Sequence, residues 1–421
     1  MKHYNSIPLH RTLPVVAVGL LLAGIFSAPT LSAQQGGNPR RGGGTLQPNG
    51  TTSRQALRGA SASTYGLGHN PLRNANRAGI IGELGGSSRT EGAVAKALLW
   101  FTRTQKEDGR WSEKQSDVAH TGLAILCYFS YGIKPDGQSE NAKALAKGLA
   151  WLIKQVPEDG NMRDGGRMYG QAIGTLALGE AAGITRREDY YKPLERAVKF
   201  LCKAQNPKSG GWRYQPHPSL QHAGDLSVTG WVIMALRSAE MAGVLVPQDN
   251  LKSARAFLDT VGTGAHKGLY GYKQATPKLS MTSVGMYCQQ LFGAKPGEVR
   301  QTDSAKFLAL HLPVEGQKDY YYWYYGCLSM FLHGGNGGVG EEHWKKWNAK
   351  MVPLFLKNQQ SNGTWKAEGR RANREGTTIT TAWATLSLTV YYRYLPITHG
   401  YTRLNTGPQG GSAIPNPPSG Q

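Results

Sequence analysis

The stretch Gln105-Lys-Glu-Asp-Gly-Arg-Trp111 returns twice in this chain. The later copies read Gln205-Asn-Pro-Lys-Ser-Gly-Gly-Trp212 and Gln359-Gln-Ser-Asn-Gly-Thr-Trp365. Each copy follows an apolar segment, so its Gln can hydrogen-bond the backbone groups freed at a helix end, and its Gly permits the turn. We expect the Trp to pack over the joint. These residues therefore belong to the scaffold rather than to a chemical site.

The segments that precede these loops set a period of about fifty residues. Gln105, Gln155 and Gln205 are equally spaced along the chain. Six copies of the segment are present, at 97–105, 148–155, 197–205, 254–258, 305–308 and 352–360. Self-similarity at a fixed period of this size is the signature of a repeat architecture.

Each copy also contains a second, more apolar segment. These segments start at Thr121, Tyr169, Thr229, Thr282, Tyr325 and Thr381. They are apolar nearly all round, as expected of helices buried on every side, whereas the first segments keep charge on one face. Twelve helices in six pairs can close into a double ring, and an open solenoid of stacked pairs is the alternative.

The Gln…Gly-x-Trp signature resembles the repeat of squalene–hopene cyclases and their relatives, the prenyltransferase and squalene oxidase repeat family, which includes protein prenyltransferase β subunits. The resemblance covers residues 91–396. It implies an all-α fold, an α/α toroid of six helical hairpins in which six inner helices stand inside six outer helices around a central cavity. We then expect the N-terminal ends of the inner helices to share one rim, where a ligand would enter.

The two ends of the chain differ from this repeat. Residues 1–33 have a basic start, an apolar run and then small residues, which predicts a signal peptide and export to the periplasm or beyond the cell; an uncleaved anchor is the alternative. Residues 34–90 hold seven Arg against one acid, Glu83, and much Gly, which predicts a disordered linker. Residues 397–421 read as a flexible tail.

The net charge of the chain, +21, is concentrated in part in this linker. It favours non-specific attraction to anionic polymers through the linker. We find no motif for a specific nucleic-acid partner, no transmembrane segment in the mature chain, and no sequence that calls for a cofactor.

Asp225 is the strongest catalytic candidate. In the cyclases that the repeat resembles, an Asp-x-Asp-Asp motif supplies the acid that protonates an alkene, and its middle Asp is the proton donor. Here only the first carboxylate matches, and Ser227 stands at the middle position. Asp225 also precedes a buried helix, and this position favours an N-cap role. Both roles are compatible with the sequence.

Asp117 occupies the matching position in the first repeat, and His120 follows three residues later. This spacing places two side chains on one helix face. A metal site is conceivable, but a zinc site normally needs a third protein ligand and the Asp, Cys and His set of protein prenyltransferases has no match here. We therefore expect no metal.

Aromatic and basic residues supply a predicted ligand wall. The aromatic candidates are Tyr169, Trp231, Tyr272, Tyr321, Trp323 and Tyr325, and the basic candidates are Arg167, Lys278 and Arg374. Aromatic faces stabilise carbocations and also stack on sugar rings, or they merely fill the core. The basic residues suit a diphosphate, sulfate or carboxylate, or form an incidental positive surface.

Three functions fit these residues. The first is an exported toroid that binds an apolar or anionic small molecule and whose chemistry is incomplete or lost. The second is a terpene cyclase-like or prenyltransferase-like enzyme that acts on a polyprenyl substrate with Asp225 as the acid. The third is a glycan-active enzyme that uses Asp117 and Asp225 as an acid–base pair. If the cavity is filled by its own aromatic side chains, both enzymatic hypotheses fail.

Overall fold

The computed structural model describes residues 77–114, 116–165, 167–216, 223–335, 337–368 and 372–392. The predicted signal peptide, residues 34–76 of the predicted linker and the predicted tail lie outside these ranges. Within the described residues, no helix is both long enough and apolar enough to cross a membrane.

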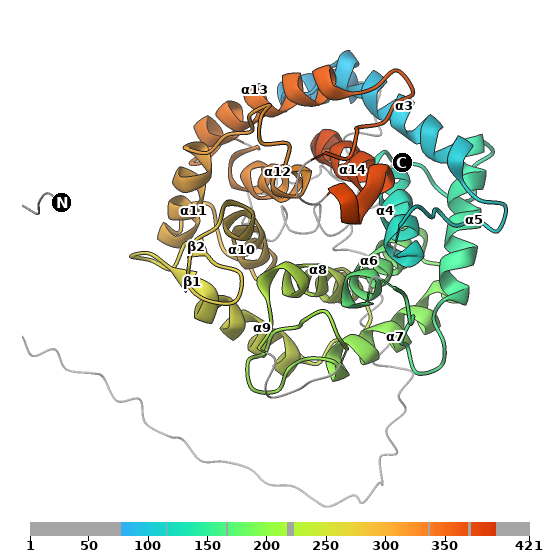
Figure 1. The fold of residues 1–421 in the computed structure, drawn as a ribbon, viewed down its shortest axis with the longest axis horizontal. Coiled ribbons are helices and arrows are strands. Elements are labelled where there is room, and N and C mark those ends of the chain that lie inside the picture. The colour runs from blue at the N-terminus through green and yellow to red at the C-terminus, as the bar shows by residue number, and fades with distance from the viewer. Residues whose placement is uncertain are drawn as a thin grey trace, which may run out of the picture. The chain divides into compact units, whose positions relative to one another are not determined.

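Twelve of the helices in the described ranges form two concentric rings, as predicted (Figure 1). The outer ring consists of α3 (Ser88–Thr104), α5 (Glu140–Lys154), α7 (Glu188–Lys203), α9 (Gln248–Val261), α11 (Val299–Ala309) and α13 (Glu341–Asn358). The inner ring consists of α4 (Asp117–Ser130), α6 (Arg167–Thr185), α8 (Leu226–Met241), α10 (Leu279–Leu291), α12 (Tyr320–Gly334) and α14 (Ala372–Leu388). Two short strands, β1 (Gly262–Thr263) and β2 (Leu269–Tyr270), pair between α9 and α10, and a 3-10 turn, η2 (Val390–Tyr392), follows α14.

Both rings are closed. The last inner helix, α14, packs against the first, α4, and the last outer helix, α13, packs against α3. The open solenoid is therefore wrong, and the predicted all-α toroid is confirmed.

The burial of the two rings follows their sequences. In α4 every residue from Val118 to Ser130 is buried, because the helix has neighbours in its own ring and in the outer ring. In α7 the buried residues recur at helical spacing, including Leu194, Val198 and Leu201, so only one stripe faces the core. Each fully buried Leu of this kind contributes about 1.5–3 kcal/mol.

The Gln and Trp residues of the repeated loops form the expected joints. The amide of Gln205 donates to the carbonyl oxygens of Gly210 at 2.7 Å and Asn250 at 2.9 Å, which ties the loop to the next outer helix. The indole of Trp212, buried in the joint, donates to Leu201 O at 2.8 Å. Trp111 and Trp365 donate in the same way, each at 2.8 Å, to Phe101 O and Phe355 O.

The third copy of the joint also closes the ring. The Gln359 amide donates to Ala93 O of α3 at 2.8 Å and to Gly363 O of its own loop at 3.0 Å. A hydrogen bond between residues at opposite ends of the repeat region therefore uses the same geometry as the internal joints.

The true register of the repeats is visible at the start of the inner helices. The hydroxyl oxygens of Thr121, Thr229, Thr282 and Thr381 each accept a hydrogen bond from the backbone N–H of the loop residue that precedes their helix. In the second repeat this acceptor is Gln171 Oε1, which binds Met162 N at 2.9 Å. The expected equivalence of Tyr169 with the four Thr residues is thus wrong by two positions. The equivalent residue is Gln171, whose longer side chain accepts the same hydrogen bond from the loop.

The boundary of the predicted linker needs a correction. Residues 77–90 were assigned to it, but they include the helix α2 (Arg77–Glu83) and the start of α3. Ile81 is buried, and Trp344 Nε1 of α13 donates to Leu84 O at 3.2 Å. The burial of Ile81, this hydrogen bond and a capping box between Ser87 and Thr90 order a stretch that its average composition marks as disordered.

Candidate functional site

The loops that lead into the inner helices meet at one end of the inner ring, which we call the mouth. Four of these loops also accept hydrogen bonds from the N-terminal end of the preceding inner helix. Glu113, two residues after Trp111, accepts from Thr377 N at 2.8 Å and Thr378 N at 2.7 Å in α14. Asp164, two residues after Met162, accepts from Val118 N at 3.3 Å and from the Ser116 hydroxyl at the start of α4. On this side of the mouth, carboxylates cap helices.

The next two loops cap with their main chain instead. Tyr214, two residues after Trp212, offers its carbonyl oxygen to Met168 N of α6 at 3.1 Å. Tyr272, two residues after Tyr270, offers its carbonyl oxygen to Leu226 N of α8 at 2.8 Å. The side chains of Tyr214 and Tyr272 are therefore not needed for capping and remain half-buried at the mouth.

Glu113 is held ionised by its capping role. Burial alone would raise the pKa of this carboxyl, but the hydrogen bonds from the backbone of Thr378 and Thr377 outweigh burial and lower it. A helix N-terminus favours a negative charge in the same way. Glu113 is accordingly part of the scaffold of the mouth.

Asp225 is fully buried at the start of α8. Its Oδ1 accepts from Val228 N at 3.0 Å and from the Ser227 hydroxyl at 2.7 Å, so the predicted N-cap is present. Its Oδ2 faces Arg213 Nη1 at 3.7 Å. Burial raises the pKa of Asp225. The hydrogen bonds from Ser227 and Val228, and the positive charge of Arg213, lower this pKa but offset only part of the effect of burial.

Ser227 joins Asp225 to the rim. Its hydroxyl oxygen lies 2.6 Å from the hydroxyl of Tyr169, so the two share a hydrogen bond. The position at which the cyclase motif has its proton donor thus holds a hydroxyl that bridges a buried carboxyl and a half-buried phenol. A neutral hydroxyl is a far weaker acid than a carboxyl, which makes it unsuited to protonating an alkene.

Three tyrosines of successive repeats form a cluster above Asp225. The rings of Tyr169 and Tyr214 are 5.8 Å apart and inclined at 40°, and the hydroxyls of Tyr214 and Tyr272 are 2.6 Å apart. Arg213 lies over the ring of Tyr214 at 5.3 Å, and Lys278 lies over the ring of Tyr272 at 5.7 Å. We call these five residues the tyrosine side of the mouth.

The other predicted aromatic residues meet in the centre of the ring. Trp231 of α8 contacts Tyr325 of α12 with ring centroids 5.5 Å apart, and Tyr321 contacts Trp383 of α14 at 5.4 Å. Tyr324 stacks on Trp231 at 5.8 Å. All five side chains are at most 4% exposed. At this level the predicted cavity is filled by the protein's own rings.

Trp323 does not belong to this wall. Its ring contacts Phe355 of the outer helix α13 at 5.8 Å and Tyr320 at 5.0 Å. Successive residues of α12 face different ways, and Trp323 faces the outer ring. Among the basic candidates, Lys278 is in the tyrosine cluster and Arg167 is exposed at the first position of α6. The side chain of Arg374 lies outside the described part of the chain.

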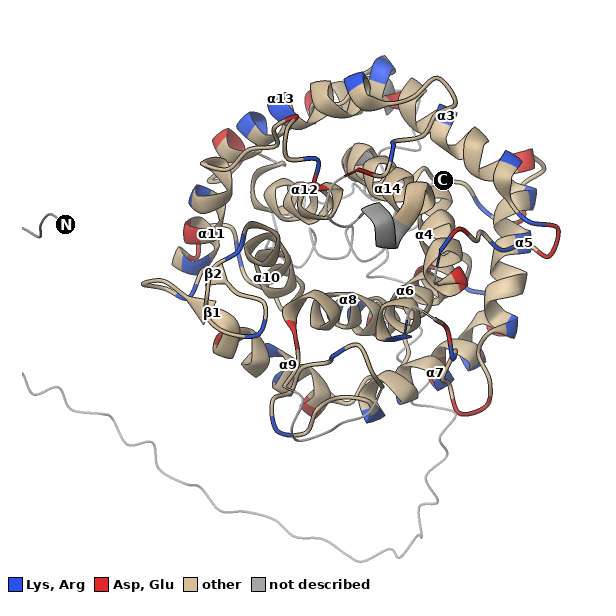
Figure 2. Ribbon diagram, in the orientation of Figure 1, with Lys and Arg blue, Asp and Glu red and all other residues tan. Residues whose placement is uncertain are grey.

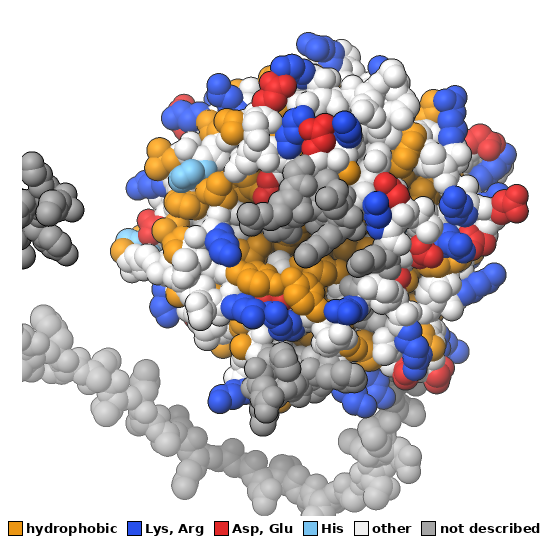
Figure 3. Space-filling view, viewed as in Figure 1, with side chains coloured by type: hydrophobic (Ala, Val, Ile, Leu, Met, Phe, Trp, Pro, Cys, Tyr) orange, Lys and Arg blue, Asp and Glu red, His pale blue; other side chains and the backbone are white. Residues whose placement is uncertain are grey.

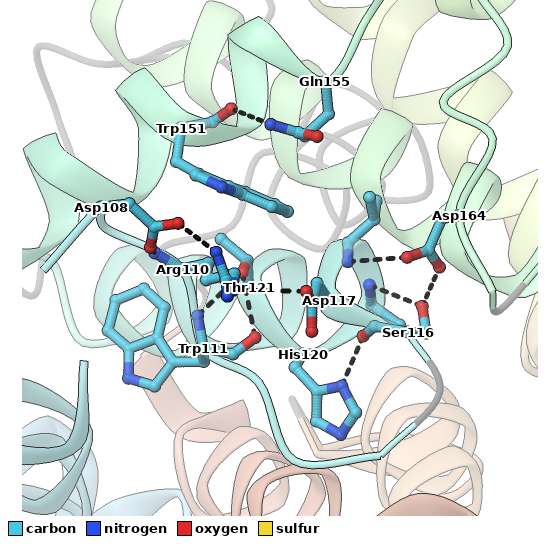
Figure 4. Close-up of polar contacts among 12 residues, drawn as sticks. Asp108, Arg110, Trp111, Ser116, Asp117, His120, Thr121, Trp151, Gln155 and Asp164 are labelled. Carbon is cyan, nitrogen blue, oxygen red and sulfur yellow. Dashed lines mark hydrogen bonds and ion pairs between the residues drawn. The ribbon is translucent and has the colours of Figure 1, made fainter. Parts of the chain in front are cut away.

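Asp117 and His120 do not come together (Figure 4). Asp117 turns toward Arg110, whose Nε lies 3.3 Å from its Oδ2, and Arg110 also binds Asp108. His120 points away from Asp117 and binds the carbonyl oxygen of Ser116 through Nδ1. The pairing inferred from their three-residue spacing is wrong, because Asp117 is the first residue of its helix and reaches back to the preceding loop.

Basic residues surround an apolar centre at this end of the protein. Lys and Arg occur in several of the segments that lead into the inner helices (Figure 2). Figure 3 shows hydrophobic side chains at the centre of this face with Lys and Arg around them. The mouth thus combines positive charge, aromatic rings and hydroxyl groups.

Arg213 and Tyr214 were not among the predicted site residues. Both follow Trp212 directly, where the Gly-x-Trp motif marks scaffold. The repeat itself contains a signal for Tyr214: in four repeats the residue two positions after the joint residue (Trp111, Met162, Trp212 or Tyr270) lies at the mouth. These four residues are Glu113, Asp164, Tyr214 and Tyr272. Aligning the repeats on the joint residue, rather than on the inner segments, would have found Tyr214, with Arg213 next to it.

Comparison with known proteins identifies solved structures that share the fold. No family model and no curated protein matches the sequence. The type II terpene cyclase MstE from Scytonema is similar in structure, with 13% sequence identity and a TM-score of 0.51, over 73% of this chain and 99% of that one. The GH76A α-1,6-mannanase from Salegentibacter sp. HEL1_6 is similar with 9% identity and a TM-score of 0.54, over 71% of this chain and 98% of that one.

The chain has the α/α toroid fold. A variant of the Scytonema cyclase in complex with geranylgeranyl dihydroxybenzoate, described as its substrate, matches with 14% identity and a TM-score of 0.51, over 75% of this chain and 99% of that one. An inactive variant of the mannanase in complex with α-1,6-mannotriose matches with 10% identity and a TM-score of 0.53, over 73% and 99%. At these identities the similarity establishes the shared fold of two enzymes with different chemistries.

Proposed function

We propose that this protein is an exported toroid that binds an anionic ligand at its mouth and has lost acid-initiated cyclisation. The observation that carries this proposal is the tyrosine side of the mouth. There Arg213 and Lys278 lie on the rings of two half-buried tyrosines that are not needed for capping. Two cations and a pair of hydrogen-bonded phenols on one rim offer an anion both positive charge and hydrogen-bond donors.

Two features argue against a polyprenyl cyclase. A polyprenyl chain needs an apolar channel, but Trp231, Tyr321 and Tyr325 fill the centre of the inner ring. The residue at the position of the family's proton donor is Ser227. The proposal therefore keeps the fold of the cyclases and assigns the ligand to the rim.

One observation favours a second, cyclase-like candidate, against the filled centre of the inner ring. Asp225 is buried and its pKa is raised, as an acid catalyst requires. For the glycosidase-like pair, Asp117 gives no comparable support, since it is bound to Arg110 on the loop side.

Export is proposed from the sequence alone. The basic residues Lys2 and Arg11, the apolar run 13–26 and the small residues up to Ala33 fit a cleaved signal. Expression of the full chain in a bacterium, followed by N-terminal sequencing of the periplasmic fraction, tests this. A mature chain that starts near residue 34 supports it, and a full-length chain in the membrane fraction overturns it.

Binding and cyclisation are tested with two probes. The purified protein is titrated calorimetrically with inorganic pyrophosphate and with geranylgeranyl diphosphate, and the second mixture is extracted for product analysis. We expect both anions to bind with similar affinity and geranylgeranyl diphosphate to be recovered unchanged. A cyclic product that disappears in Asp225→Asn would establish the cyclase-like candidate. Failure of both anions to bind would overturn the proposed mouth.

A further inference from the structure

The tyrosine side of the mouth has a chemistry more specific than positive charge. We infer that its ligand is an acidic saccharide, a sugar chain that carries carboxylate groups, held by Tyr169, Tyr214, Tyr272, Arg213 and Lys278. This inference rests on the proposed function and names the ligand class for the same site.

Arg213 and Lys278 make no hydrogen bond to a carboxylate of the described residues, although Arg213 has Asp225 as a distant ion-pair partner. Arg213 Nη1 is buried and has no hydrogen-bond partner there; Asp225 Oδ2, at 3.7 Å, is too far for one. Lys278 is exposed, and its ammonium group contacts the ring of Tyr272 rather than a carboxylate of the described residues. A guanidinium with an unused donor is well suited to a carboxylate from a ligand.

The rings favour a sugar over a flat ring system. Tyr169 and Tyr214 are inclined at 40° with centroids 5.8 Å apart, so they do not form a parallel slot for a nucleobase. A pyranose chair is puckered and presents C–H groups that pack against the face of an aromatic ring, so it does not need a parallel slot. The electron-rich ring faces attract these weakly positive hydrogens.

The hydroxyl groups add hydrogen-bonding partners suited to a polyol. The pairs Tyr214–Tyr272 and Tyr169–Ser227 each have oxygen atoms 2.6 Å apart. In each pair one hydroxyl donates to the other, and a phenol oxygen has further acceptor capacity for a ligand O–H. The residues come from three successive repeats, α6 and the loops before α8 and α10, so the site is elongated along the rim.

The competing class, an apolar lipid, lacks a place to bind. The apolar rings that would surround a lipid chain, Trp231, Tyr321, Tyr324 and Tyr325, contact one another and are at most 3% exposed. The groups that remain accessible at the rim are half-buried phenols and cations. These phenols and cations are complementary to the hydroxyl and carboxylate groups of an acidic saccharide.

The test compares three ligands in calorimetric titrations with the full chain. Tetragalacturonate carries both sugar rings and negative charge. Its methyl ester keeps the sugar rings without the charge, and tricarballylate carries negative charge without a sugar. We expect tetragalacturonate to bind at least tenfold more tightly than either control. Tricarballylate binding as tight as tetragalacturonate would overturn the sugar class while the anion site stands. No binding of either anion would overturn both.

Variants identify the site. Tyr214→Leu removes a ring, whereas Tyr214→Phe keeps the ring and removes only its hydroxyl. We expect Tyr214→Leu to weaken tetragalacturonate binding about tenfold and Tyr214→Phe to weaken it less. Circular dichroism confirms that both variants are folded. Equal affinity of Tyr214→Leu and the wild type for tetragalacturonate would overturn the assignment.

Discussion

The hydroxyl of Ser227 donates a 2.7 Å hydrogen bond to Oδ1 of Asp225. This bond fixes the carboxyl at the start of α8 and links it through Tyr169 to the mouth. The strongest catalytic candidate of the sequence is thereby the anchor of a polar network.

The anchoring role predicts how Asp225 responds to substitution. Asp225→Asn keeps an acceptor for Val228 N and Ser227, so we expect a free energy of unfolding close to that of the wild type. Asp225→Ala removes the cap and leaves the buried Val228 N–H and Ser227 hydroxyl without their acceptor, which lowers the free energy of unfolding by about 1–3 kcal/mol. Urea unfolding measures both variants. An Asn variant as unstable as the Ala variant would show that the charge toward Arg213, not the cap, is essential.

The turn glycines of the joints should tolerate no side chain. Gly210 has a φ of +75°, and a Cβ there would lie 2.2 Å from Ser253 O. We expect Gly210→Ala to destabilise the protein by about 2 kcal/mol or more, since strain and collision add. Gly92→Ala is the matched control, because Gly92 lies in α3 with nothing within 4 Å of the added carbon. It should raise stability by about 0.5–1 kcal/mol. Thermal melts that rank the two variants the other way would refute the joint model.

Gln359 closes the ring, so its loss should destabilise the protein more than the loss of Gln155. Gln359→Ala removes two hydrogen bonds, one of which reaches Ala93 O of α3. We expect a loss of about 1–3 kcal/mol because buried carbonyl groups lose their donor. Gln155 bonds only to Trp151 O in its own helix at 3.2 Å among the described residues, so Gln155→Ala should cost less than about 1 kcal/mol. Similar losses in chemical denaturation would contradict the closing role of Gln359.

A buried histidine predicts a loss of stability in acid. Burial, followed by the neighbouring His343, lowers the pKa of His333 to about 4. An unfolded chain protonates histidine near pH 6.5, so between about pH 6.5 and 4 the unfolded state binds the extra proton. The free energy of unfolding therefore falls as the pH falls through this window, by up to about 3 kcal/mol.

The measurement is urea unfolding at several pH values. His333→Gln should flatten the dependence between about pH 6.5 and 4, while His311→Gln, at an exposed position, should leave it unchanged. A wild-type slope that survives in His333→Gln would assign the effect to other groups.

Much of the fold could be predicted from the sequence, because its determinants are local and repeated. Gln105, Gly109 and Trp111 recur in two further loops, and all three copies make the same bonds. The inner helices were recognisable because they are apolar on all sides. The short helix α2 was missed since its ordering depends on Ile81 and Leu84 contacting a distant part of the toroid.

The site was predictable only in part. Asp225, Tyr169, Tyr272 and Lys278 come together as expected of one rim. The pairing of Asp117 with His120 failed because spacing alone does not show that Arg110 competes for the carboxylate. Trp323 was misplaced because a run of aromatic residues does not reveal its helical phase.

The central claim is that an anion binds at the mouth, and Lys278 tests it most directly. The dissociation constant of pyrophosphate is measured by calorimetry for the wild type, Lys278→Gln and the charge-matched control Lys143→Gln, which changes an exposed lysine of the outer helix α5. The account predicts at least tenfold weaker binding for Lys278→Gln and unchanged binding for Lys143→Gln. Equal dissociation constants for the two variants would contradict it.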